Sequence, residues 1–548
     1  MDQATSTTTL HHHLTRTQSA AGIQFRWLLT IILTFTFATC FLRNFVLPHA
    51  TVMFWSDQML FASDGARIVA GQMPYRDYFQ FVTPGADLVY AFLFRHLGLL
   101  LWIPNALMVC LAVTGVLLMT LAARKVLHGS LIALPAALTV GFILFGGLDA
   151  THHWFSGLIA LLAMLVLFPV SEESSESERS EKSKASQNWR IALTGALCGL
   201  VASFTQSKGA TVTAGFLLYL LWQSFDKKQK ASVLCRRCLL LCGAALLVFL
   251  AINGPYMAAL GMKEWIKWLI VFPFRYYPTL PAQTWRSPID DFRYQTGFIR
   301  WICIPFVYLT IPLVYLVFLR VMYRRRRIEP DQPWNQLLLL AITGLALFLA
   351  VAPCLSVMRV SCAGLPGMVL LTWLLNRWGR QGRVAAAALA ALSLAIAVYL
   401  PVRNQTMHWH YLDLPAGRTA ILDPNRYELY RWMAENTHPG QMYFGVGPLA
   451  LPLWLQTPAP ISAPIPYEYD RPEHIAASIA AIETNRVPLL LLKPYRYLAG
   501  TWGYTDDHLR PFQAYLDQHY RYIKTFPAGF EVWERKDGLQ PDLKRLHR

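Results

Sequence analysis

The sequence is poor in charged residues. Only 15% of its 548 residues are Asp, Glu, Lys or Arg, whereas 55% are hydrophobic, and soluble globular proteins carry about 25% charged residues. Stretches such as 239–252 and 384–400 contain no charge at all, as expected of segments that cross a bilayer. These observations exclude an all-soluble enzyme and indicate a polytopic membrane protein.

Acidic residues are the scarcer charge. There are 32 Asp and Glu against 49 Lys and Arg, which gives a net charge of +17. The basic residues stand in short clusters between apolar stretches, which is where cytoplasmic loops normally carry them. We therefore attribute the net charge to membrane orientation and expect no nucleic-acid partner.

Cysteine is absent from the last third of the chain. None of the nine cysteines follows Cys362, so the C-terminal tail has no disulfide framework that would report its redox compartment. The tail also lacks a phosphate-binding loop, a pair of metal ligands and a nucleophile elbow. Chemistry is therefore expected elsewhere in the chain.

The apolar pattern predicts eleven membrane spans and a cytoplasmic N-terminus. Residues 1–22 are rich in Thr, Ser and His and are expected to be disordered, as is the charged cytoplasmic linker 171–188. Segment 86–97 is taken as an interfacial helix, because counting it as a span would place the basic clusters outside. The spans lie at about 26–44, 101–123, 130–148, 154–170, 191–206, 209–222, 237–258, 300–320, 334–352, 362–376 and 384–400.

Three large loops then face the outer side of the cell (inner) membrane, at 45–100, 259–299 and 401–548. In the tail, Asp423-Pro424 and Asp470-Arg471-Pro472 read as helix starts. Short apolar runs at 441–446, 487–492, 520–526 and 530–534 read as strands. We therefore predict an all-α membrane domain over 23–400 and an extracytoplasmic α/β domain over 401–548.

The first outer loop holds an unusual cluster of ionisable residues at the membrane border. Asp57 and Asp64 are about two helical turns apart on one face, so both carboxylates are expected to look into one cleft. For Asp57 the alternative is a helix N-cap. For Tyr75-Arg76-Asp77 the alternative is a turn with an internal ion pair.

These residues resemble the GT-C superfamily of integral membrane glycosyltransferases, in particular bacterial relatives of the dolichyl-phosphate-mannose protein mannosyltransferases and the aminoarabinose transferases. The family's outer loop opens with an acidic pair, followed by an amphipathic helix, a G-x-x-P-Y-x-D stretch and a Pro-led interfacial helix. The matching segments here are Asp57-Gln58, 64–70, Gly71 to Asp77, and Pro84-Gly85 to Gly98. One departure matters: Gln58 stands at the second acidic position, so Asp57 is the only member of the pair that can supply a carboxylate.

The resemblance implies transfer of a sugar from a polyprenyl-phosphate donor to an outer acceptor, usually with inversion. Such a reaction needs a carboxylate to deprotonate the acceptor hydroxyl, here Asp57. It also needs cations on the lipid phosphate. The candidate cations on the outer side are Arg67, Arg76, Lys208 and Arg359, and for Lys208 snorkelling to the interface is an equal alternative.

A second outer motif, Asp149-Ala-Thr-His152-His153-Trp154, occupies the loop where the superfamily has another acidic group. Asp149 is expected to position the acceptor or a metal, and His152 to assist by a hydrogen bond. The alternative is an interfacial His-His-Trp belt. No cofactor is certain, and the sequence leaves open whether a divalent metal takes part.

Aromatic residues fill the middle loop and predict an amphipathic helix at the membrane surface, from Trp265 to Tyr277. The expected partners are the lipid-linked donor, membrane lipids, and a protein, lipid or glycan acceptor. Two other classes stay open: a lipid or polysaccharide transporter, and a non-catalytic subunit of an envelope assembly. The outer-edge position of the charges and the absence of internal repeats favour the enzyme.

Overall fold

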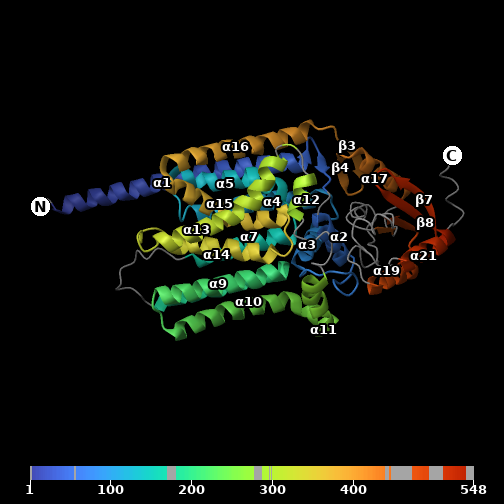
Figure 1. Ribbon diagram of the computed structural model, residues 1–548, viewed down its shortest axis with the longest axis horizontal. Helices are drawn as coiled ribbons and strands as arrows, with labels where there is room; N and C mark the ends of the chain where they lie inside the picture. The colour runs from blue at the N-terminus through green and yellow to red at the C-terminus, as the bar shows by residue number, and fades with distance from the viewer. Residues whose placement is uncertain are drawn as a thin grey trace.

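A computed structural model describes residues 3–54, 57–168, 181–276, 287–294, 297, 299–437, 443–445, 472–492 and 510–538. Long helices run roughly side by side and form a bundle, and a region that contains strands lies beyond one end of it (Figure 1). This arrangement confirms the prediction of a helical membrane part followed by an α/β region.

Seven helices in the described part of the chain are long and apolar enough to cross a membrane. They fall at 23–44 within α1 (Gln3–Asn44), α4 (Trp102–Ala123), α10 (Ala231–Leu260), 301–325 ending in α13 (Ile311–Arg325), α14 (Trp334–Val351), α15 (Val357–Arg377) and α16 (Gly379–Thr406). The chain is therefore a multi-pass membrane protein.

The predicted number of eleven spans is not confirmed. The other four expected spans correspond to α7 (His152–Leu167), α8 (Glu181–Phe204), α9 (Gln206–Asp226) and an interrupted segment. That segment joins η1 (Gly129–Ile132), α5 (Ala133–Leu138), η2 (Thr139–Ile143) and α6 (Leu144–Gly147). These elements are shorter, broken or less apolar than the seven.

Two segments expected to be disordered are partly helical. The first helix starts at Gln3, and no proline interrupts the chain before the apolar span, so the helix extends outward from that span. Helix α8 starts at Glu181, within the predicted linker 171–188, and residues 169–180 lie outside the described part.

The first outer loop forms two short helices that pack closely on each other. Helices α2 (Asp57–Val69) and α3 (Gly85–Leu97) have 13 residues each. At Gly65 a Cβ atom would lie 2.5 Å from Cβ of Tyr90, so only glycine allows this approach. Helix α3 is too short to cross a bilayer and is packed on α2, in keeping with the interfacial prediction for 86–97.

A small mixed sheet, which the sequence did not predict, joins the first outer loop to the start of the tail. Its order is β1-β2-β4-β3, with β1 (Phe45–Val46), β2 (Ala50–Val52), β3 (His410–Leu414) and β4 (Gly417–Ile421). Strand β2 runs parallel to β4, with Thr51 opposite Thr419. The tail therefore pairs with the strand that leads towards Asp57.

The rest of the tail has the predicted α/β pattern. A second sheet has the order β5-β6-β8-β7, with β5 (Tyr443–Gly445), β6 (Leu489–Leu492), β7 (Tyr520–Phe526) and β8 (Phe530–Arg535). Its helices are α17 (Pro424–Asn436), α19 (Pro472–Thr484) and α21 (Arg510–His519). The Asp423 side chain caps α17 as predicted, whereas Asp470 and Arg471 lie outside the described residues.

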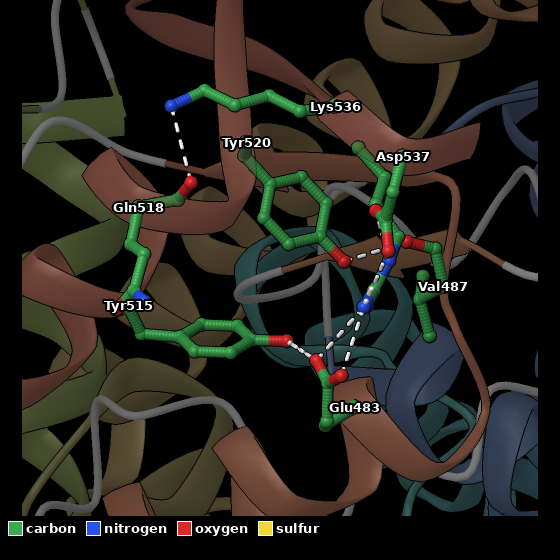
Figure 2. A network of polar contacts seen from close by, with 8 residues as sticks. Glu483, Val487, Tyr515, Gln518, Tyr520, Lys536 and Asp537 are labelled. Atoms are coloured by element: carbon green, nitrogen blue, oxygen red, sulfur yellow. Dashed lines mark hydrogen bonds and ion pairs between the residues drawn. The ribbon is translucent and has the colours of Figure 1, made fainter. Parts of the chain in front are cut away.

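One buried arginine ties these elements together. Arg535 is 4% exposed, and its guanidinium donates to both Glu483 oxygens at 2.9 Å and to Asp537 at 2.8 Å. Figure 2 shows the groups that meet around the Glu483 carboxylate, including the Tyr515 hydroxyl, which donates to it at 2.6 Å. A single network thus links α19, α21, β8 and the turn after it.

The middle loop forms the predicted amphipathic helix, as α11 (Met262–Ile266) and η4 (Lys267–Tyr276). One face is buried and packs towards the first outer loop, where the Phe79 ring meets Trp268 and Phe272. The other face is exposed and carries Met262, Ile266, Ile270 and Phe274. Tyr277 lies outside the described residues.

Candidate functional site

Four helices begin close together at one end of the bundle. They are α2, α7, α9 and α15, which start at Asp57, His152, Gln206 and Val357. Contacts between their first turns define the site: the Phe61 and His152 rings are 4.9 Å apart, and the Thr151 hydroxyl lies 3.7 Å from the Met358 sulfur. The unpaired N–H groups and dipoles of converging helix N-termini favour an anion.

Asp57 is the first residue of α2. The residue is accessible to solvent, but the many protein atoms near its carboxyl reduce the hydration of that group. This desolvation raises the pKa of the carboxyl above its ordinary value of 3.8, and the positive charge of Arg359 opposes the rise. The carboxylate thus gains basicity while staying within the electrostatic range of a cation. Trp55 and Ser56, just before it, lie outside the described residues.

Lys208 is completely buried near the start of α9. Its ammonium donates to the His153 carbonyl at 2.8 Å, and no carboxylate among the described residues forms an ion pair with it. A buried ammonium is costly unless a negative group neutralises it. The surface-snorkelling alternative does not describe this side chain, which points inward between α7 and α9.

Arg359 lies in the first turn of α15. Ser356 is the N-cap of this helix, and its hydroxyl accepts from the Arg359 backbone N–H. The guanidinium donates to the Cys354 carbonyl at 2.8 Å. Its charge acts on Asp57, on Lys208 and on both histidines of α7. Arg359 therefore belongs to the same site as these four groups.

Asp149 and His152 stand at the start of α7, and both are buried. The His152 carbonyl accepts from the hydroxyls of Ser156 and Thr205, at 2.6 and 3.2 Å, which fixes α7 against the start of α9. The Asp149 charge acts on Tyr90 of α3. The second outer motif thus adjoins the first outer loop.

Asp64 lies in a second cluster, separate in its contacts from Asp57. The Gln80 amide donates to Asp64 at 3.1 Å and to Asp87 at 3.4 Å, and all three side chains are buried. Burial raises the pKa of both carboxyls, and Asp64 raises that of Asp87 further. Arg67 acts on Asp64 and lies over the Tyr78 ring at 5.3 Å, so its charge serves this cluster.

Tyr75, Arg76 and Asp77 form a tight turn. Arg76 pairs with Asp77 at 2.7 Å, and the Asp77 carboxylate accepts from the Met73 amide at 2.7 Å, which is the internal ion pair of the alternative interpretation. Tyr75 has a positive φ of 68°, an uncommon conformation for a bulky residue. Its hydroxyl donates to the Val82 carbonyl at 2.8 Å, which holds the turn closed.

The described residues contain no group of three or more His, Cys, Asp or Glu side chains that could hold a metal ion. Structural metal sites in proteins usually need at least three such ligands.

Sequence reasoning noted Gln58 only as a departure from the family pattern and missed Asn105, and neither buried amide was expected to take part in the site. Gln58 donates to Asn105 at 3.4 Å and accepts from the Ala150 amide at 3.3 Å. The signal available was polarity within apolar surroundings: Asn105 is the one amide in the otherwise apolar start of the 101–123 span. Asp87, within the predicted interfacial helix 86–97, was likewise not expected to be a site residue.

Comparison with solved structures finds a similar overall fold in two kinds of membrane protein. Structures of ArnT from Cupriavidus metallidurans, bound to undecaprenyl phosphate and in the apo state, have TM-scores of 0.55 and 0.54 at 13% and 14% identity. These matches cover 92% and 94% of this chain and 97% and 98% of ArnT. The archaeal oligosaccharyltransferase AglB from Archaeoglobus fulgidus, in complex with an inhibitory peptide and a dolichol-phosphate, has a TM-score of 0.51 at 11% identity, over 95% of this chain and 75% of its own.

No protein-family model and no curated protein matches the sequence. Since ArnT and AglB belong to the GT-C superfamily, the structural likeness confirms the GT-C fold that the first outer loop predicts.

Proposed function

We propose that this chain is a membrane glycosyltransferase that moves a sugar from a polyprenyl-phosphate donor to an acceptor on the outer side, with inversion. One observation supports the proposal: the charge of Arg359 acts both on Asp57, the first residue of α2, and on the Lys208 ammonium, which is buried without a carboxylate partner among the described residues. Cations and a carboxylate in one place are what this reaction requires.

The cations supply the phosphate site. Lys208 and Arg359 neutralise the donor phosphate and stabilise the negative charge that grows on it as the sugar leaves. The starts of α7, α9 and α15 add backbone N–H groups and dipoles of the same sign. Binding of the anion then repays the cost of keeping Lys208 buried.

Asp57 acts as the general base. Its carboxylate takes the proton of the acceptor hydroxyl, the oxygen attacks the anomeric carbon, and the bond from that carbon to the phosphate oxygen breaks. The electron pair of that bond leaves with the polyprenyl phosphate, which needs no acid. The raised pKa of Asp57 strengthens the base, and its exposure lets the proton pass to solvent.

Two features support the nature of the donor and the orientation of the chain. The solved neighbours bind undecaprenyl phosphate and dolichol-phosphate. Basic side chains lie at the other end of the bundle, where Arg326 pairs with Asp226 and Arg377 with Glu329. By the positive-inside tendency that end is cytoplasmic, and the site and tail face outward.

The test is sugar transfer by the purified chain in lipid vesicles, with a panel of radiolabelled polyprenyl-phosphate pentoses and hexoses. Peptide, lipid and glycan acceptors are offered in separate reactions. We expect a labelled acceptor with one donor class. Movement of intact donor across the vesicle membrane without sugar transfer would show that the protein is a transporter and not an enzyme. If no donor is either transferred or transported, the protein would be a non-catalytic subunit.

A further inference from the structure

A buried polar network lies directly behind Asp57. Its centre is Asn105 on α4, 3% exposed, whose amide nitrogen donates to the carbonyl of Asn44 at 2.7 Å and to that of Val52 at 2.9 Å. These carbonyls end α1 and β2. One side chain thus joins the two elements that precede the Asp57 segment.

The network continues through Gln58, the residue next to Asp57. Gln58 is fully buried, donates to the Asn105 oxygen and accepts from the Ala150 amide. The Ala150 carbonyl in turn accepts from the Tyr90 hydroxyl at 2.9 Å. The amide nitrogen and oxygen of Gln58 both form hydrogen bonds. The backbone of Ala150, the residue after Asp149, is bonded at its N–H by Gln58 and at its carbonyl by Tyr90.

The orientation of each amide is determined by its partners. The nitrogen of Asn105 must face two backbone carbonyls, so its oxygen must face Gln58, which therefore has to donate. An ionised carboxylate at position 58 cannot donate and would face an oxygen. The glutamine that departs from the family's acidic pair is thus the residue this network requires.

The tail is attached to the same network. The Met53 amide donates to the Ala420 carbonyl at 2.9 Å, and the Thr419 hydroxyl donates to the Thr51 carbonyl at 2.9 Å. Strand β4 of the tail therefore holds β2 from one side while Asn105 holds its last carbonyl from the other.

We infer that Asn105 and Gln58 are positioning residues that fix the Asp57 carboxylate relative to Asp149 and to the cations of the site. This inference rests on the proposed function. A shift of about 1 Å in a reacting group can cost about 100-fold in rate, so loosening the network lowers turnover more than it weakens donor binding.

The experiment compares Asn105→Leu and Gln58→Glu with Thr120→Val in purified chain. Thr120 is also buried on α4, and its hydroxyl donates to the Val116 carbonyl within the same helix. We expect kcat to fall about 10- to 100-fold in the first two variants with the donor KM within about threefold. Lower pH should partly restore Gln58→Glu, because a protonated carboxyl can donate to Asn105.

Hydrogen exchange gives a second measurement that needs no substrate. Asn105→Leu should speed amide exchange in peptides covering 50–60 and 148–155 but not in the cytoplasmic ends of α13 and α15, while Thr120→Val leaves all of them unchanged. Unchanged exchange in both outer peptides, or an unchanged kcat in an active preparation, would overturn the inference. If the wild-type protein transfers no sugar but Asn105→Leu still exchanges its amides faster, the proposed function is rejected, whereas the role of the network in holding these segments stands.

Discussion

Replacement of Lys208 by Met separates the functional from the structural role of this side chain. Methionine keeps a flexible, mostly apolar chain of similar length and removes the ammonium. In the fold, the change deletes one hydrogen bond, to the His153 carbonyl at 2.8 Å, and one buried charge. In the proposed reaction, it deletes a main cation of the phosphate site.

The two effects have opposite signs. Leaving a buried carbonyl without its donor costs about 1–3 kcal/mol, whereas the penalty for a buried ion is several kcal/mol, roughly enough to outweigh that loss. The ligand-free variant should thus be at least as stable as the wild type. Loss of a charged contact to the developing phosphate charge is worth about 2.7–4 kcal/mol, or about 100- to 1,000-fold in kcat.

The assay measures thermal unfolding with and without polyprenyl phosphate, together with sugar transfer. Lys208→Met should unfold no earlier than wild type without ligand and should lose the stabilisation by polyprenyl phosphate. Lys263→Met is the matched control, because Lys263 is an exposed lysine of α11. Ligand stabilisation and transfer equal to wild type in Lys208→Met would refute the assignment of the phosphate site.

Three further changes test the surroundings of the site and the tail. Burial raises the pKa of Asp64 to about 7, so ionising this carboxyl costs stability between about pH 4 and pH 7. Over that range Asp64→Asn should become increasingly more stable than wild type, measured by thermal unfolding. Asp77→Asn should do the opposite, because pairing with its neighbouring arginine lowers the Asp77 pKa; the wild-type advantage should vanish as the pH falls below about 4. Arg535→Gln should destabilise the tail by about 1–2 kcal/mol, since its carboxylate partners are half exposed, and should speed proteolysis after residue 406. Unchanged pH profiles or an unchanged cleavage rate would contradict these expectations.

Much of the fold could be predicted because its signals are local. Long apolar runs marked the spans, and Asp423-Pro424 marked the start of α17. The mixed sheet could not be predicted, because β2 has three residues and its partner β4 lies more than 360 residues later in the chain. Such short strands are defined by tertiary pairing and carry almost no alternating pattern of their own.

The candidate site could be predicted in part. Outer-side charge identified Asp57, Lys208 and Arg359, which the structure brings together. Helical spacing alone suggested one cleft for Asp57 and Asp64, whereas Asp64 is turned towards the Gln80 amide. Which buried polar group faces which depends on packing between distant segments, and spacing along one helix does not contain that information.

The central claim is that Asp57 is the base that activates the acceptor, and single-turnover sugar transfer by Asp57→Asn tests it most directly. Asparagine keeps the size and the helix start but cannot take the proton, so transfer should fall at least about 100-fold. Stabilisation by polyprenyl phosphate should persist, because the cations are intact. Wild-type transfer rates in this variant, with a donor that the wild-type protein uses, would contradict the account.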